Sequence, residues 1–168
     1  MSKLPLTIAV SRYDLVADVL NGIVPVQGID LNVLNLHVEE TFFRMLRNRE
    51  FDVAEMSLSS YTVMAARGNA PFVAIPVFPS RFFRHGCIFV SAKSGIREPR
   101  DLIGKRIGVP VYTMTAAIFI RGLLSDEYGI DFANNEWLEG DINSAKPHGN
   151  PTILPTARKL SIAANKTG

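Results

Sequence analysis

The sequence predicts an α/β protein in which open sheets are flanked by helices and divided between two lobes. Short apolar segments alternate with stretches of helical spacing over the first half, which is typical of an open α/β sheet. A second strand-and-helix pair follows after residue 96. The 168 residues are 47% hydrophobic and 20% charged, which is enough apolar material to bury a core. No apolar run approaches the roughly 20 residues that span a membrane.

The first half of the first lobe contains two strands and two helices. The apolar run at residues 4–10 predicts the first strand. Residues 14–20 have helical spacing and end before Asn-Gly, which predicts a helix. Residues 29–36 largely alternate apolar and polar side chains, as a strand does. Residues 38–49 predict a helix whose first turn holds glutamates and whose later part holds arginines, an arrangement that suits the helix dipole.

The rest of this lobe follows the same order. Residues 51–56 predict a third strand, and the serines after it can cap a helix at residues 61–67 that ends at a glycine. Residues 72–78 predict a fourth strand, which an internal proline places at a sheet edge or a bulge. A short strand is expected at residues 88–91.

The second lobe is expected to begin near residue 96. Residues 99–102 predict a short helical turn, residues 105–109 a strand and residues 112–128 a helix closed by a glycine. Residues 136–138 predict a further short strand. After residue 140 the pattern fails, because prolines crowd the chain and no period follows.

Positive charge is concentrated in the middle of the chain, although the net charge is only +2. Residues 56–125 hold nine basic and two acidic side chains, and no carboxylate occurs between residues 56 and 97. This pattern predicts a surface that binds an anion. The alternative is that these cations pair with carboxylates of the flanking segments. Nucleic-acid binding is not expected, since no DNA- or RNA-binding motif accompanies the charges.

Three polar turns are candidate binding sites. Ligands of open α/β sheets bind at the carboxyl ends of strands, and the free N–H groups of a helix start bind anions. The first turn follows the third strand and contains Ser57, Ser59, Ser60 and Tyr61. The second precedes the long helix of the second lobe and contains Tyr112, Thr113 and Thr115. Two such helix starts facing one another would form a cleft for a small anion, and plain helix capping is the alternative for both.

The third turn follows the fourth predicted strand and contains Arg81, Arg84 and His85. Arginine holds carboxylates through paired hydrogen bonds, and histidine titrates near neutral pH. The alternative is a surface loop with an inert histidine.

Metal and cofactor sites are not expected. The histidines at positions 37, 85 and 148 lack ligand spacing, and the single cysteine, Cys87, excludes an internal disulfide. Cys87 is expected to be a buried small residue. There is neither a Walker pattern nor a dinucleotide fingerprint. The first residues do not form a secretory signal, so a cytoplasmic protein without membrane contact is expected.

Three segments resemble 4,5-dihydroxyphthalate decarboxylase, a family with the type 2 periplasmic-binding-protein fold: EETFFRMLRNREFDVAEMSLSSY, PFVAIPVFPSRFFRHGCIFV and REPRDLIGKRIGVPVYTMTAA. The resemblance implies a ligand between two lobes, the first at residues 1–87 and the second at 93–168, with a hinge crossing at 88–92. Such a fold needs a complete second lobe and a return crossing, so we expect this sequence to be the N-terminal portion of a longer protein.

The implied reaction is non-oxidative loss of CO2 from 4,5-dihydroxyphthalate, giving protocatechuate in aromatic catabolism. We expect Arg81 and Arg84 to bind carboxylate and His85 to donate the proton. The substrate-binding groups are expected to be the hydroxyl-bearing residues of the two helix-start turns: Ser57, Ser59, Ser60, Tyr61, Tyr112, Thr113 and Thr115. The alternatives are a non-enzymatic protein of the same fold that binds a small carboxylated ligand, and a fragment without function. A homo-oligomer is left open.

Overall fold

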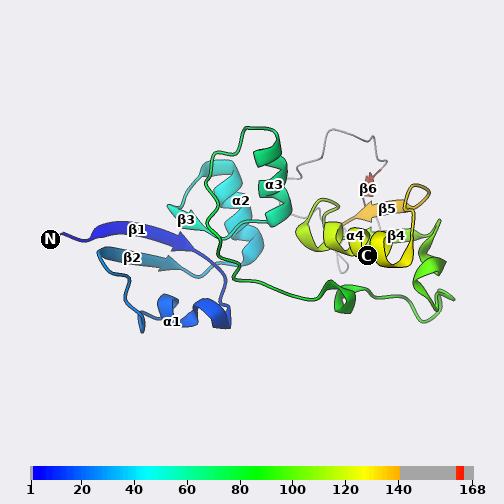
Figure 1. Cartoon of the computed structure of the whole chain (residues 1–168), viewed down its shortest axis with the longest axis horizontal. Helices are drawn as coiled ribbons and strands as arrows, with labels where there is room; N and C mark the ends of the chain where they lie inside the picture. Colours follow the sequence, from blue (N-terminus) through cyan, green and yellow to red (C-terminus); the bar gives the residue numbers. More distant parts are fainter. Residues whose placement is uncertain (1, 141–161, 165–168) are drawn as a thin grey trace. The chain divides into compact units, whose positions relative to one another are not determined.

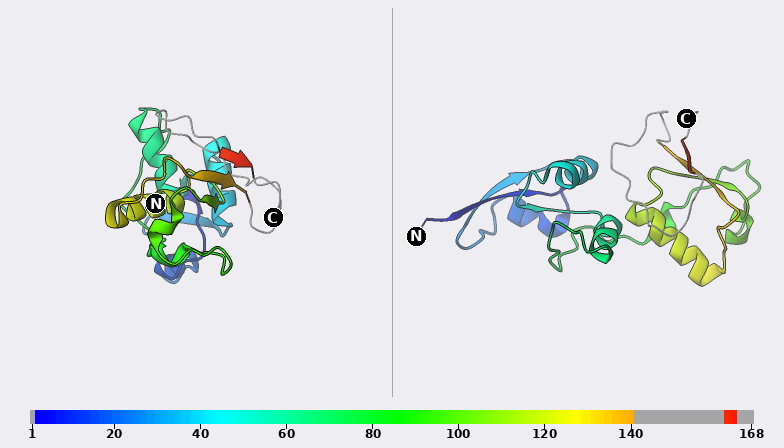
Figure 2. Two further views of the ribbon diagram at one scale, coloured as in Figure 1. Left: turned by 90° about the vertical axis from the view of Figure 1, so that its right-hand side faces the viewer. Right: turned by 90° about the horizontal axis from the view of Figure 1, so that it is seen from above.

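A computed structural model of the chain describes residues 2–140 and 162–164. These residues form two compact units. Unit 1 consists of residues 2–57 and 70–81, and unit 2 of residues 58–69, 82–140 and 162–164. Each unit contains a parallel three-stranded sheet with helices packed beside it (Figures 1 and 2). The predicted α/β class with open sheets is confirmed.

Unit 1 is built on a sheet whose strand order is β2-β1-β3. Strand β1 (Leu4–Ala9) pairs in parallel along its whole length with β2 (Ile29–Leu34), and β3 (Val53–Ala54) pairs with the end of β1. Strand β3 is short because the Asp52 side chain accepts a hydrogen bond from the Thr7 backbone N–H at 2.8 Å, where a longer ladder would continue. The chain therefore runs from the central strand to one neighbour and then crosses to the other side.

One helix supplies most of the core of unit 1. Helix α2 (Val38–Asn48) directs Thr41 and Met45 inward, and Met45 packs with Ala9 and Phe51. Figure 1 shows α2 beside β3. A 3-10 turn at Asp14–Val16 leads into the short helix α1 (Ala17–Leu20), which contributes no fully buried residue.

Unit 2 has the strand order β4-β5-β6, formed by Arg106–Val109, Glu136–Glu139 and Ile162–Ala164. The unit also contains helices α3 (Leu58–Ala66) and α4 (Thr115–Tyr128) and 3-10 turns at Arg84–Cys87 and Pro99–Leu102. Helix α4 ends where Gly129 takes a positive φ of 66°, a conformation that glycine adopts without strain. Leu102, Leu124 and Ile130 form the apolar core. Among the described residues, no helix is both long and apolar enough to cross a bilayer.

The strands predicted at residues 72–78 and 88–91 are wrong. Both segments are irregular, and most of their apolar side chains are exposed to solvent: Val73 is 91% exposed and Phe89 is 87% exposed. Phe72 and Ile88 are partly buried against the cores of units 1 and 2. The apolar pattern is present, but no described strand forms a ladder with either segment, and a strand needs backbone partners to be stable. Pro76 also removes one donor from any such ladder.

The remaining boundaries moved by a few residues. Helix α4 begins at Thr115 rather than residue 112, and α3 begins at Leu58 rather than residue 61. The unit division groups α3 and residues 82–87 with unit 2, whereas we expected them in the first lobe. The hinge at residues 88–92 stays a prediction. The proline-rich residues 141–161 and His148 lie outside the described residues.

A surface substitution tests whether the irregular segment around Phe83 is exposed in solution. Phe83 is 88% exposed, so Phe83→Ser should change the free energy of unfolding by less than about 0.5 kcal/mol. Phe51 is 6% exposed, and Phe51→Ser should cost several-fold more because it empties the core. Urea titration of both variants measures the difference. Equal losses would show that the segment is packed in solution.

Candidate functional site

Buried hydroxyl groups join the starts of α3 and α4 within unit 2. The Ser59 hydroxyl donates to the Thr113 carbonyl oxygen at 2.7 Å and lies 3.2 Å from the Thr115 hydroxyl. The Ser59 backbone N–H donates to the Thr115 hydroxyl oxygen at 3.1 Å. Ser59, Ser60 and Thr113 are at most 9% exposed. The two helix-start turns singled out in the sequence therefore lie together.

The hydroxyl groups of this cluster make hydrogen bonds within the cluster. Ser59 satisfies backbone and side-chain groups of the α4 turn, which fits the capping alternative more directly than an open anion site. Ser57 precedes α3, and Tyr61 lies half-buried on that helix. Substrate binding by these residues stays a prediction.

Removing the Ser59 hydroxyl should loosen unit 2. Ser59→Ala leaves the buried Thr113 carbonyl without this donor, which costs about 1–3 kcal/mol of unfolding free energy. Ser125→Ala, an exposed position on α4, is the matched control and should have an effect within about 0.5 kcal/mol. Thermal melts of the two variants compare them. Identical melting temperatures would contradict the structural role of Ser59.

The turn before α4 is held from both sides. Glu139, at the carboxyl end of β5, accepts a hydrogen bond from the Tyr112 N–H, and Arg121 on α4 donates to the Tyr112 carbonyl oxygen at 2.9 Å. The Arg121 guanidinium lies 3.8 Å from the Tyr112 ring centroid and 5.2 Å from that of Trp137. Burial lowers the pKa of Arg121, and no carboxylate of the described residues pairs with it. The negative electrostatic potential of the two aromatic faces attracts the guanidinium.

His85 lies at the opposite end of α4 from the hydroxyl groups. Its Nε2 is 3.6 Å from the Glu127 carboxylate, in the last turn of the helix. Thr115 is in the first turn, and a rise of 1.5 Å per residue separates the two positions by about 18 Å. The structure therefore does not bring His85 together with Ser59, Thr113 and Thr115.

The predicted arginines fall in different units. Arg81 is exposed and ends the second segment of unit 1, whereas Arg84 belongs to unit 2 and lies 5.8 Å from the Phe82 ring centroid. Neither arginine forms an ion pair with a described carboxylate. Both remain available to an anionic ligand, and their role stays a prediction.

A polar cluster that we did not predict lies at the carboxyl edge of the unit 1 sheet. The Ser11 backbone N–H follows β1 and donates to Glu55 Oε1 at 2.9 Å, and Glu55 directly follows β3. The Ser11 hydroxyl donates to the Leu36 carbonyl oxygen at 2.9 Å. Tyr13 lies beside this carboxylate. Its pKa is raised, first by burial and then by Glu55, while the nearby hydroxyls of Ser11 and Ser80 act in the opposite direction.

A sequence signal for this cluster existed. Ser11 comes immediately after the first predicted strand, and Glu55 is near the end of the third, at residues 51–56. The carboxyl ends of strands are where ligands of open α/β sheets bind. Only the serines after Glu55 were predicted as binding residues. Ser80 belongs to the same loop as the predicted Arg81.

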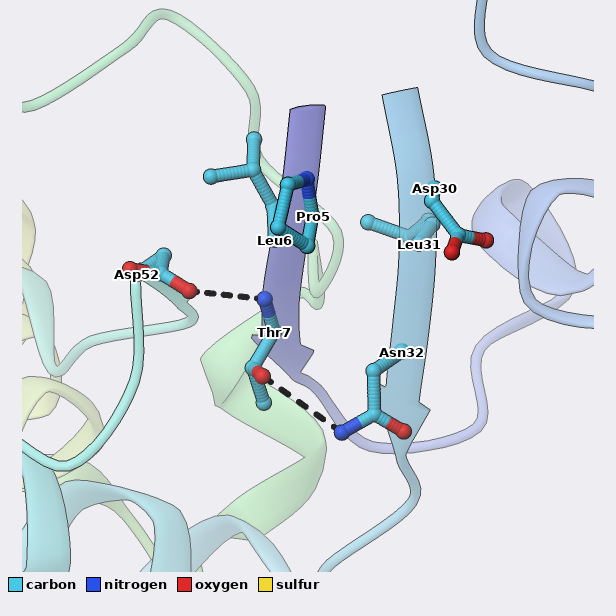
Figure 3. Close-up of a pocket in the computed structure, with 7 residues that line it drawn as sticks. All are labelled: Pro5, Leu6, Thr7, Asp30, Leu31, Asn32 and Asp52. Carbon is cyan, nitrogen blue, oxygen red and sulfur yellow. Dashed lines mark hydrogen bonds between the residues drawn. The ribbon is translucent and has the colours of Figure 1, made fainter. Parts of the chain in front are cut away.

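A hollow of unit 1 lies away from this cluster. It has a volume of about 530 Å³ and is lined along β1 and β2 by Pro5, Leu6, Thr7, Asp30, Leu31 and Asn32, with Asp52 beside them (Figure 3). Asp52 precedes β3, so the hollow is near the amino ends of the strands. Its two carboxylates and lack of a lining cation make it unsuited to a dianion. Among the described residues, no group of three His, Cys, Asp or Glu side chains is placed to hold a metal ion.

The chain is similar in sequence to two curated proteins. It is 46% identical over 140 residues to a protein named 4,5-dihydroxyphthalate decarboxylase from Comamonas testosteroni, covering 83% of this chain and 42% of the relative. It is 42% identical over 140 residues to a protein of the same name from Pseudomonas putida, covering 83% of this chain and 54% of the relative. The resemblance noted in the sequence is confirmed. The chain spans about half the length of these relatives.

A family model gives the broader relationship. It matches residues 9–146, from the last residue of β1 to beyond the end of β5. Its description is "ABC transporter, phosphonate, periplasmic substrate-binding protein". The parallel α/β sheets of both units fit a binding-protein fold. Since the match covers well over half of its residues, the chain belongs to this family of periplasmic-binding-protein-like domains.

Proposed function

We propose that the chain belongs to an enzyme that removes CO2 from 4,5-dihydroxyphthalate without oxidation and releases protocatechuate. The observation that carries this proposal is the identity of 42–46% over 83% of the chain to two proteins named for that decarboxylation. The match includes the polar turns described above. A carboxy-lyase activity is thus a better proposal than binding alone.

The proposed chemistry uses the ring hydroxyls of the substrate. Each carboxylate has a hydroxyl para to it, and the electron density of that oxygen lets the carboxylated carbon accept a proton. The bond to the carboxylate then breaks, CO2 leaves, and the bonding pair restores the aromatic ring. The site needs cations for the second carboxylate and a proton donor for the carbon.

Arg81 and Arg84 are proposed as the cations, because neither is committed to a described carboxylate. His85 is proposed as the proton donor.

Replacement of His85 tests its assignment. His85→Gln should lower the rate of CO2 release from 4,5-dihydroxyphthalate by about 10²–10⁴-fold, the usual contribution of a general acid. His37→Gln, at an exposed histidine in unit 1, is the control and should be without effect. Unchanged turnover in His85→Gln would exclude His85 as the acid. The test is stringent because His85 lies about 18 Å from the Thr115 turn along α4.

The second candidate function is binding without catalysis, which the description of the matching family favours. Incubation with 4,5-dihydroxyphthalate separates the two. Release of CO2 supports the enzyme, and tight binding without turnover supports a binding protein.

Fractionation adds a second readout, because we place the decarboxylase in the cytoplasm and a transport-linked binder in the periplasm. A chain that neither melts cooperatively nor binds would support the third interpretation, a fragment without function. A homo-oligomer stays a prediction.

A further inference from the structure

A hollow lies in unit 2 where the chain approaches strand β4. It has a volume of about 240 Å³, and all of its lining residues come from one stretch of chain, residues 94–105. Pockets for drug-sized ligands usually have volumes of about 300–1,000 Å³, so this hollow suits a smaller molecule. None of its lining residues belongs to the three polar turns predicted from the sequence. The hollow is therefore separate from the residues assigned to decarboxylation.

The loop on one side of the hollow is fixed by its own hydrogen bonds. The Ser94 hydroxyl donates to the Ser91 carbonyl oxygen at 2.6 Å, and the Ser94 N–H donates to the same oxygen at 2.9 Å. Gly95 then takes a positive φ of 75°, which glycine adopts without strain. Apart from its chain neighbours, no described atom lies within 4 Å of the place that a Gly95 Cβ would take. The backbone at Gly95 is therefore open to a ligand.

The other side of the hollow is the 3-10 turn at Pro99–Leu102. Asp101 Oδ2 accepts the Arg97 N–H at 2.8 Å and the Glu98 N–H at 3.1 Å, which closes the turn. Leu102, the last residue of the turn, is 9% exposed and packs in the apolar core with Leu124 and Ile130. The turn is thus attached to the core, and the backbone that carries the lining side chains has a defined place.

Positive charge exceeds negative charge in this lining. Arg100 and Lys105 line the hollow, and no carboxylate of the described residues lies within ion-pair distance of either. Asp101 is the one carboxylate in the lining, and its Oδ2 is taken by the two backbone N–H groups. These N–H groups, and the charge of Lys105 to a smaller extent, hold the pKa of Asp101 below its usual value. The lining therefore has one net positive charge at neutral pH, which suits a monoanion.

Apolar surface lies beside these cations. Ile96 and Ile103 both line the hollow. Ile96 is half-buried against the core cluster of Leu102, whereas Ile103 is 47% exposed. A ligand that covers Ile103 removes this apolar area from water, which favours binding of a molecule with an apolar part.

We propose that this hollow binds a small monocarboxylate with an apolar body, in which Arg100 and Lys105 hold the carboxylate while Ile96 and Ile103 contact the body. The planar guanidinium of arginine matches the two oxygens of a carboxylate, and the lysine ammonium adds a second charge. The inference does not depend on the proposed decarboxylation, because it uses no residue of that site.

Titration of the 168-residue chain with benzoate at pH 7, followed by NMR, tests the hollow. The Gly95 amide resonance should shift and saturate. Benzamide has the same shape without the charge, so it should bind at least about fivefold more weakly at Gly95. Acetate has the charge without the ring and should also bind at least about fivefold more weakly. Equal affinities of benzoate and benzamide, or a Gly95 resonance that does not move, would overturn the proposal.

Two variants with a matched control test the role of the cations. Arg100→Gln and Lys105→Gln should each weaken benzoate binding by about fivefold. Arg106→Gln makes the same change in net charge at an exposed residue that does not line the hollow, and its dissociation constant should stay within about twofold of the original. All three positions are exposed, so the melting temperatures should be nearly unchanged. Equal weakening in the three variants would show that binding follows net charge alone, and unchanged binding in Arg100→Gln and Lys105→Gln would show that neither cation holds the ligand; either result overturns the site.

Discussion

Replacing Trp137 with alanine is expected to lower the free energy of unfolding of unit 2 by about 3–5 kcal/mol. Trp137 is 3% exposed on the central strand β5, and its ring meets Tyr112 at 5.1 Å and Phe132 at 5.6 Å between centroids. The same ring supports the half-buried charge of Arg121. Its loss therefore creates a cavity and removes part of the compensation for a cation that no described carboxylate neutralises.

Circular dichroism in urea measures this effect, because Trp137 is the only tryptophan and its fluorescence disappears with it. Phe119→Ala is the matched control, since Phe119 is an aromatic side chain on α4 that is 55% exposed. The control should lose less than about 1 kcal/mol. Comparable losses in both variants would mean that the aromatic core around Trp137 does not stabilise unit 2.

The elements that depend on local sequence were predicted, and those that depend on distant partners were not. Helix α2 carries its own apolar face and its own charge order, so it was found within a residue of its ends. Residues 72–78 carry an equally apolar pattern, but a strand also needs a neighbour, and apolar content cannot supply the backbone partner. Helix α4 starts at Thr115 because Met114 is extended, with a ψ of 148°. The turn before it is held by the hydrogen bond from the Tyr112 N–H to Glu139, a contact across 27 residues.

The candidate site shows the same difference between residues with a local sequence signal and residues placed by distant partners. The turns at Ser59 and Thr113 were found because hydroxyl residues before a helix are a local signal, and the structure places them in contact. Glu55 was missed although it is near the end of the third predicted strand, because its contact with Ser11 depends on the long-range pairing of β3 with β1. His85 was selected for its chemistry alone, and its place beside Glu127 depends on how the 3-10 turn at Arg84–Cys87 packs against α4.

Met45→Ala should destabilise unit 1 by about 2–5 kcal/mol and leave unit 2 almost unaffected. Met45 is 8% exposed and packs with Ala9 and Phe51, a cluster that shares no residue with the core around Leu124. Phe43→Ala is the control, because Phe43 is on the same helix and is 40% exposed. Hydrogen exchange at β1 and β2 follows unit 1, while the fluorescence of Trp137 follows unit 2. A matching loss in hydrogen-exchange protection and in the Trp137 fluorescence signal would mean that the two cores unfold as one. A loss in exchange protection alone would establish that each unit is stabilised by its own apolar cluster.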